Sequence, residues 1–105
     1  MLGDLERAVM DVAWARPHVT VREVVSALVA GRKPAYTTVM TVMNRLVEKG
    51  ILKRRQNGQS YRYAATMTRC EFLKACSREV VDTLVRCYGT AAIAPLTDAI
   101  GRAGK

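Results

Sequence analysis

The sequence predicts a mainly α-helical chain of the α+β class, in which three short helices precede a β-hairpin and a longer helix follows it. Three observations carry this prediction. Apolar residues recur at helical spacing over most of the 105 residues, Asn57-Gly58 stands between two β-prone runs, and Gly and Pro separate the helical segments. A chain of this length can bury one modest core and has room for one appended element.

The first helix is expected from Leu2 to Ala15. Leu5, Val9 and Val12 form an apolar stripe on this segment, while charged residues occupy the opposite face. Pro17 then ends the helix, because proline cannot continue the backbone hydrogen-bonding pattern.

The second helix begins after a short apolar link, His18-Val19. Thr20 can accept a hydrogen bond from the backbone N–H of Glu23, while the Glu23 side chain accepts one from the N–H of Thr20. This reciprocal capping box opens a helix with an apolar side, and Gly31 is expected to end it.

The third helix is expected over residues 35–49, with Gly50 as its stop. One face is apolar, and the other is rich in threonine, which is a mediocre helix former. Small hydroxyls together with an arginine suit close approach to DNA base edges and phosphates, although a face that simply lies in solvent is the alternative. The predicted DNA-contacting residues on this helix are Tyr36, Thr37, Thr38, Thr41, Asn44 and Arg45.

A basic hairpin follows, because Asn57-Gly58 lies between the β-prone residues 51–55 and 60–64. Alternation along a strand places Tyr61 and Tyr63 on one face of the hairpin and Arg62 on the other. Two successive helices followed by a basic hairpin form the order of a winged helix-turn-helix. The residues of this wing that are predicted to hold phosphate are Lys53, Arg54, Arg55 and Arg62.

The remaining third of the chain predicts a helical dimerisation arm. Thr68 and Glu71 form a second capping box, and the helix they open is expected to end at Gly89. Its apolar residues recur at coiled-coil spacing in a stripe too wide to stay exposed, which predicts a symmetric dimer. Folding of this helix back over the winged domain is the alternative. The predicted dimer-interface residues are Phe72, Leu73, Cys76, Val80, Leu84, Cys87 and Tyr88.

A short final helix is expected to begin near Pro95, with a frayed tail from Gly101 onward. We therefore divide the chain into a winged-helix DNA-binding domain, residues 1–66, and a helical dimerisation region, residues 67–105. The net charge is +8, and residues 1–66 hold +6 of it. A basic module of this kind suits a polyanionic partner, and its binding should weaken steeply with salt.

The composition also excludes several function classes. His18 is the only histidine, so a Ser-His-Asp catalytic site would depend on it entirely. We therefore expect neither an enzyme nor a cofactor. Cys70, Cys76 and Cys87 cannot pair completely, and their spacing fits no zinc motif. No apolar run approaches the ~18 residues of a membrane-spanning helix, and the N-terminus does not read as a secretory signal. The expected location is the cytoplasm, without membrane contact.

Three segments resemble the penicillinase-repressor (BlaI/MecI type) family of winged-helix transcriptional regulators. Residues 2–11 with Trp14 are similar to the opening helix of that family. Residues 36–50 resemble its recognition helix, including the Thr-Val-x-Thr, Arg-Leu and Lys-Gly elements. The hairpin that ends in Tyr61-Arg62-Tyr63 resembles its wing.

The resemblance implies a homodimeric repressor that binds an inverted repeat in double-stranded promoter DNA. Thr38, Thr41 and Arg45 match the groove-facing positions of the family's helix, and Arg62 with residues 53–55 would hold phosphate. Release by a β-lactam or other stress signal, through an upstream signalling protease, is also implied. This sequence has neither an Asn-Phe pair of the cleaved kind nor the Cys-x-Cys pair of copper-responsive relatives.

Two other function classes stay open. The first is a protein-interaction module that uses the 68–88 helix, with the basic charge serving solubility. It predicts behaviour toward DNA that is insensitive to salt and blind to sequence. The second is a thiol- or metal-responsive regulator that acts through the cysteines.

Overall fold

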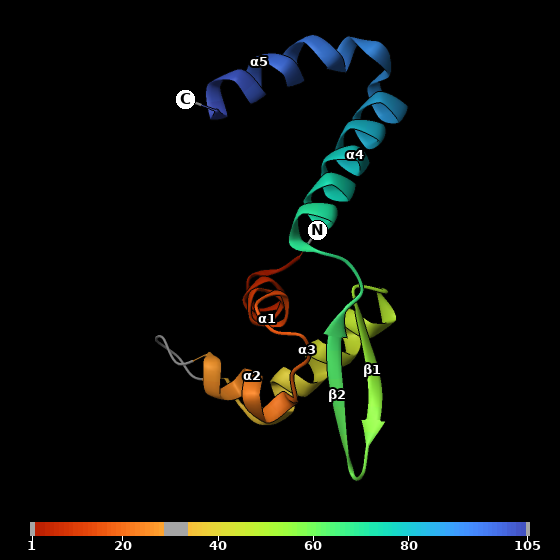
Figure 1. Cartoon of the computed structure of the whole chain (residues 1–105). Coiled ribbons are helices and arrows are strands. Elements are labelled where there is room, and N and C mark those ends of the chain that lie inside the picture. Colours follow the sequence, from red (N-terminus) through yellow and green to blue (C-terminus); the bar gives the residue numbers. More distant parts are fainter. Residues whose placement is uncertain (1, 29–33, 105) are drawn as a thin grey trace. The chain divides into compact units, whose positions relative to one another are not determined.

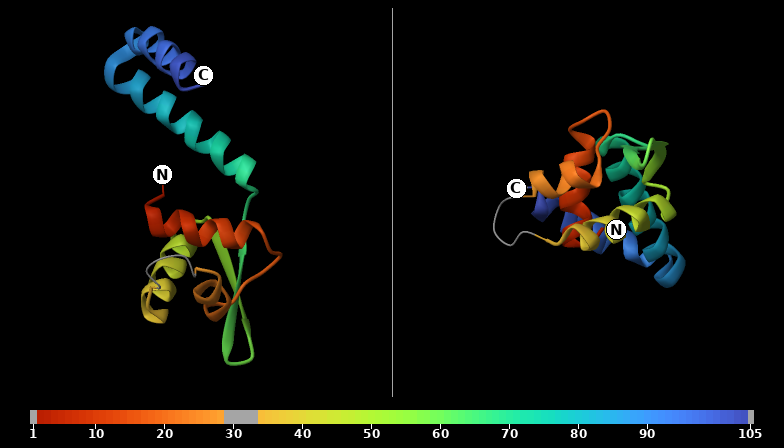
Figure 2. Two further views of the ribbon diagram at one scale, coloured as in Figure 1. Left: turned by 90° about the vertical axis from the view of Figure 1, so that its left-hand side faces the viewer. Right: turned by 90° about the horizontal axis from the view of Figure 1, so that it is seen from below.

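The computed structural model describes residues 2–28 and 34–104, and the chain forms two compact units, Met1–Arg69 and Cys70–Lys105. The fold class is the predicted one, since the described residues are mainly helical and include one antiparallel hairpin (Figures 1 and 2). The elements are α1 (Asp4–Trp14), α2 (Val21–Ala27), α3 (Tyr36–Glu48), β1 (Leu52–Asn57), β2 (Ser60–Ala65), α4 (Arg69–Tyr88), the 3₁₀ helix η1 (Gly89–Ala92) and α5 (Ile93–Ala103).

The core of the first unit lies where α1, α2 and α3 meet the hairpin. The whole predicted apolar stripe of α3 is buried, so its polar face must point outward. This burial positions the site. Each Å² of apolar surface removed from water stabilises the fold by about 25 cal/mol, and over a whole helix face this outweighs most local preferences. The buried residues of the stripe are Val39, Val42, Met43 and Leu46.

α1 begins at Asp4 because the backbone N–H of Gly3 donates to Glu6 Oε1 at 3.0 Å. Lys49 Nζ, just past the end of α3, donates to Glu6 Oε2 at 2.7 Å and ties the two helices together. At the other end of α1, the indole Nε1 of Trp14 donates to the carbonyl of Met67 at 3.1 Å. One carboxylate therefore both caps α1 and anchors α3.

The predicted capping box of α2 is confirmed. Glu23 N–H donates to Thr20 Oγ1 at 3.1 Å, and Thr20 N–H donates to Glu23 Oε1 at 3.0 Å. The helix ends at Ala27, earlier than expected, because Leu28 leaves the helical conformation and packs its half-buried side chain against the core. The expected stop, Gly31, lies outside the described residues.

The link before α2 forms an isolated β-bridge with the hairpin. Val19 is fully buried and exchanges two backbone hydrogen bonds with Tyr63, from Val19 N–H at 2.8 Å and from Tyr63 N–H at 2.7 Å. The chain between α1 and α2 is thereby attached along β2, the strand of the hairpin that lies nearest to it.

The hairpin has a tighter turn than expected. Asn57 pairs with Ser60, so the loop consists of Gly58 and Gln59 alone and both strands extend to its edge. Gly58 has φ +68°, and no described residue other than glycine has a positive φ. Glycine at the first loop position, followed by a residue with negative φ, is the requirement of a type II′ turn.

In the second unit, Gly89 has φ +72° and follows the last residue of α4, as predicted. The expected fraying from Gly101 is wrong, because α5 continues to Ala103. An ion pair from Arg102 to Asp98 at 3.2 Å and a bond from Gly104 N–H to the Ile100 carbonyl at 3.0 Å hold its last turn. No residue of α4, η1 or α5 is buried.

Acid is expected to destabilise the first unit in part through Glu6. Hydrogen bonds from Lys49 and Gly3 hold the pKa of Glu6 below its ordinary 4.5. The ionised form therefore stabilises the fold above that pH, and the contribution is lost as pH falls through the lower pKa of the folded state. Glu6→Gln should lower the free energy of unfolding at neutral pH by about 0.5–1 kcal/mol.

Urea denaturation of the wild type and Glu6→Gln across the acid range checks this expectation. The variant should show a shallower loss of stability in acid and keep the part due to Glu23, whose pKa is also lowered. Asp11→Asn, an exposed change on the same helix, is the control. An identical acid dependence in Glu6→Gln and the wild type would contradict the expectation.

Candidate nucleic-acid interface

The outer face of α3 presents the predicted threonines and arginine. Thr37, Thr38, Thr41 and Arg45 are exposed, whereas Asn44 is half-buried. Thr41 Oγ1 donates to the backbone carbonyl of Thr37 at 2.9 Å, so its hydroxyl proton is used within the helix. Outward it offers oxygen lone pairs and a methyl group, which can accept from a base amino group or contact a thymine methyl.

Asn44 lies between α3 and the hairpin. Its Oδ1 accepts one hydrogen bond from Arg54 Nη1 at 2.9 Å and another from the Tyr63 hydroxyl at 2.8 Å. Two donors on one atom define it as the oxygen of the amide. The side chain was predicted to contact DNA, but its acceptor holds the hairpin to α3, which leaves the Nδ2 end for a ligand.

The strand register divides the four predicted phosphate-binding cations between two faces of the hairpin. Arg54 stands opposite Tyr63, and its guanidinium carbon lies 4.8 Å from the centre of the Tyr61 ring. This face carries both tyrosines, as predicted, and points toward α3. The cations of the other face are Lys53, Arg55 and Arg62.

A groove of about 520 Å³ lies between the beginnings of α2 and α3 and the tip of the hairpin. Tyr36, Met40 and Tyr61 line it and keep about 48%, 37% and 41% of their surface exposed. Sequence reasoning named Tyr36 alone. Met40 follows Tyr36 by one helical turn, which was an available signal, but only the fold brings Tyr61 to the same groove.

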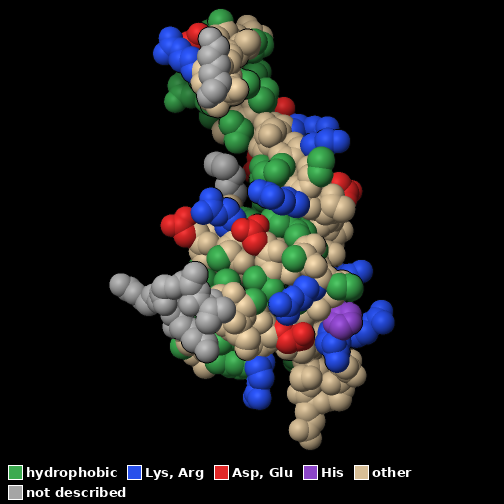
Figure 3. Space-filling view, turned by 60° about the vertical axis from the view of Figure 1, so that its left-hand side comes forward, with side chains coloured by type: hydrophobic (Ala, Val, Ile, Leu, Met, Phe, Trp, Pro, Cys, Tyr) green, Lys and Arg blue, Asp and Glu red, His purple; other side chains and the backbone are tan. Residues whose placement is uncertain are grey.

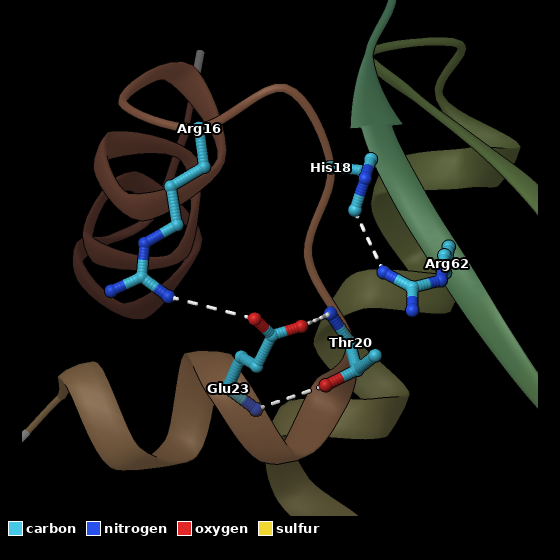
Figure 4. A network of polar contacts seen from close by, with 5 residues as sticks. All are labelled: Arg16, His18, Thr20, Glu23 and Arg62. Atoms are coloured by element: carbon cyan, nitrogen blue, oxygen red, sulfur yellow. Dashed lines mark hydrogen bonds and ion pairs between the residues drawn. The ribbon is translucent and has the colours of Figure 1, made fainter.

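On the face of the hairpin away from α3, His18 and Arg62 are in contact. Arg62 Nη1 lies 3.0 Å from His18 Nδ1, and because a guanidinium only donates, Nδ1 accepts and the ring proton sits on Nε2 (Figure 4). Glu23 is close by. Hydrogen bonds from Thr20 lower the pKa of Glu23 most, and the charges of Arg16 and Arg62 add to this.

The predicted dimer-interface residues lie along α4 without burial. Leu73 and Tyr88 expose about 51% and 73% of their surface. All three cysteines are free thiols. Within residues 2–28 and 34–104, no cluster of three or more His, Cys, Asp or Glu side chains could hold a metal ion. No helix of that same part is long and apolar enough to cross a membrane.

Comparison with known proteins identifies a family. Residues 2–100 match the family described as Penicillinase repressor. The transcriptional regulator BlaI of Mycobacterium tuberculosis (strain CDC 1551 / Oshkosh) is 49% identical over 73 residues, which cover 69% of this chain and 53% of the relative. The chain thus spans about half the length of this relative.

Two solved structures share the fold. The solution structure of the DNA binding domain of the repressor BlaI has a TM-score of 0.58 and 26% sequence identity. The solution structure of the Bacillus licheniformis BlaI monomeric form in complex with the blaP half-operator has a TM-score of 0.55, also at 26% identity. In both cases the likeness covers 66% of this chain and 84% of the other.

Removal of the Asn44 acceptor is expected to destabilise the first unit. Asn44→Ala leaves the part-buried Tyr63 hydroxyl without its partner and should cost about 1–3 kcal/mol of unfolding free energy. In a Tyr63→Phe background the same change should cost less, because no hydroxyl is left unsatisfied. Urea denaturation of the two single variants and the double variant measures the coupling, and strictly additive losses would contradict it.

Proposed function

Because the chain belongs to the penicillinase repressor family, we propose that it is a sequence-specific repressor of transcription that binds double-stranded promoter DNA. The observation that carries the proposal is the exposed threonine and arginine face of α3, held beside a basic hairpin. A family of repressors is not a family of enzymes. The blaP half-operator bound to the BlaI relative supports DNA as the partner.

In this proposal α3 enters the major groove and the hairpin follows the backbone. Arg45 can donate to the O6 and N7 acceptors of guanine, while Thr38 and Thr41 contact base edges. Tyr36 and Thr37, at the start of the helix, suit phosphate or sugar contacts. Asn44 contributes only its Nδ2, because its oxygen is held by the hairpin.

We further propose that two copies pair through the α4–α5 unit and place two α3 helices on an inverted repeat. The support is physical, since a unit with no buried residue and with exposed apolar side chains gains stability when a second copy covers it. Half-sites about one helical turn of DNA apart, roughly 34–36 Å, would match such a pair. Repression would follow from occlusion of the promoter, in the cytoplasm where the DNA is.

Release belongs to the same proposal. A single copy brings one α3 to the operator, so any β-lactam or other stress signal that separates the copies, for instance through an upstream protease, lowers the affinity for the inverted repeat. The 105 residues contain no Asn-Phe pair of the cleaved kind.

Binding to the DNA upstream of the protein's own coding sequence tests the function. Thr41→Ala and Arg45→Ala should each weaken binding to that DNA by about 1–3 kcal/mol and reduce its preference over random duplex. The assay is fluorescence anisotropy over a salt series, with random duplex as competitor. Thr97→Ala is a matched control, because Thr97 Oγ1 also donates to the carbonyl four residues earlier, at 2.9 Å.

Two results would count against the proposal. Unchanged affinity in both variants would remove α3 as the reading helix. Binding that is weak, blind to sequence and insensitive to salt would favour a protein-interaction module instead.

Pairing of copies is tested by sedimentation equilibrium. The wild type should sediment at twice its 11.6 kDa mass. Leu73→Glu should shift it toward the monomer, because Leu73 is half-exposed in one copy and would be covered in the pair. Lys74→Glu, an exposed change at the next position, should leave the mass unchanged. A wild type that stays monomeric at high concentration would contradict the pairing.

A further inference from the structure

We propose that the hairpin carries a second phosphate-binding surface, which holds duplex DNA outside the stretch that α3 contacts. This surface, the far-face patch, consists of Lys53, Arg55 and Arg62, with His18 at its edge. The proposal rests on the proposed function, because it concerns the same duplex. It adds that the hairpin contacts DNA with both faces and that its second face grips the flanking backbone without reading sequence.

The strand register sets the direction of the patch. Arg54 reaches α3 through Asn44, so its face of the hairpin is the one turned toward the recognition helix. Lys53 and Arg55, its two neighbours in β1, must point the opposite way, because side chains alternate along a strand. The patch therefore lies on the face of the hairpin opposite α3 and the bases that α3 would contact.

A surface hollow of about 400 Å³ lies on this side of the hairpin. Its lining includes no acidic side chain among the described residues, and Figure 3 shows Lys and Arg side chains around the single histidine. The residues that border it are Pro17, His18, Lys53, Arg54, Arg55, Arg62 and Ala64.

The charges of the patch are not neutralised by ion pairs. Within the described residues, neither Lys53 nor Arg55 forms a salt bridge. Arg62 donates to His18 and, among the described residues, forms no ion pair, although its charge acts on Glu23. The Glu23 carboxylate, on which Arg62 acts, is already held by Thr20 and by Arg16 at 3.9 Å (Figure 4).

The arrangement favours an extended polyanion over a small anion. Lys53 and Arg55 stand two residues apart on one strand, which separates them by about 7 Å. Two base pairs of duplex rise about 6.8 Å along one DNA strand, so the two cations match every second phosphate of that strand. Arg62 lies directly across from Arg55 and widens the row. Flanking duplex on the hairpin side of the operator is the occupant that has this repeat.

The test compares two duplexes. The first is the core of the protein's own upstream DNA, defined as the base pairs whose substitution changes its affinity, and the second is the same core extended by about one helical turn, roughly 10 base pairs, at each end. Lys53→Gln/Arg55→Gln should bind the extended duplex about tenfold more weakly and bind the core within twofold of the wild type. The salt dependence on the extended duplex should fall by about two released counterions, since each phosphate contact contributes ~0.9.

The matched control removes the same kind of charge from the same strand at Arg54, which borders the hollow but directs its guanidinium to Asn44 on α3. Arg54→Gln retains an amide that can donate to Asn44 and should weaken both duplexes by the same factor. An equal loss on both lengths in Lys53→Gln/Arg55→Gln would overturn the proposal, because the patch would then touch the core. No loss on either length would also overturn it and would point to an acidic protein partner. A wild type without preference for its own upstream DNA would overturn the proposed function itself, and with it this one.

Discussion

Tyr63 is the residue on which the geometry of the first unit depends. Its backbone exchanges two hydrogen bonds with Val19, and its ring is 2% exposed within the core. Its hydroxyl donates to Asn44 on α3. The interhelical link, the hairpin and the outward-facing helix are therefore held through one side chain, and none of them can shift without breaking a buried or part-buried hydrogen bond. A polar contact at this point orients elements that apolar packing alone would leave free to slide.

The contact of Arg54 with Asn44 also determines on which faces of the hairpin the positive charges lie. Arg54 is drawn toward α3 by Asn44 and lies over Tyr61, whereas its neighbours on β1 face outward from the sheet. Positive charge is thus distributed around the hairpin instead of being concentrated beside the helix. In the proposed complex with DNA, long-range attraction depends on the total charge, whereas the phosphates that are contacted depend on this division.

Features set by neighbouring residues could be predicted from the sequence. The Thr20 and Glu23 cap, the buried stripe of α3 and the glycine after α4 each depend on a few adjacent positions. The role of Asn44 could not be predicted, because its partners come from two strands that follow later in the chain and meet it only in the fold. The groove formed by Met40 and Tyr61 has the same origin. The end of α2 was misplaced because Leu28 leaves the helical conformation and packs against the core, which no local stop signal indicated.

The folding of the helices that follow the hairpin can depend on the concentration of their partner. α4 and α5 have 20 and 11 residues and no buried side chain among them, and most of the stability of a helix in a protein comes from packing of its apolar face. Whatever covers their apolar side chains also orders them, so their folded population depends on how much of that partner is present. If the partner is another copy, dilution of the chain disorders the arm and empties paired sites together. A cell could then clear its promoters through slower synthesis alone.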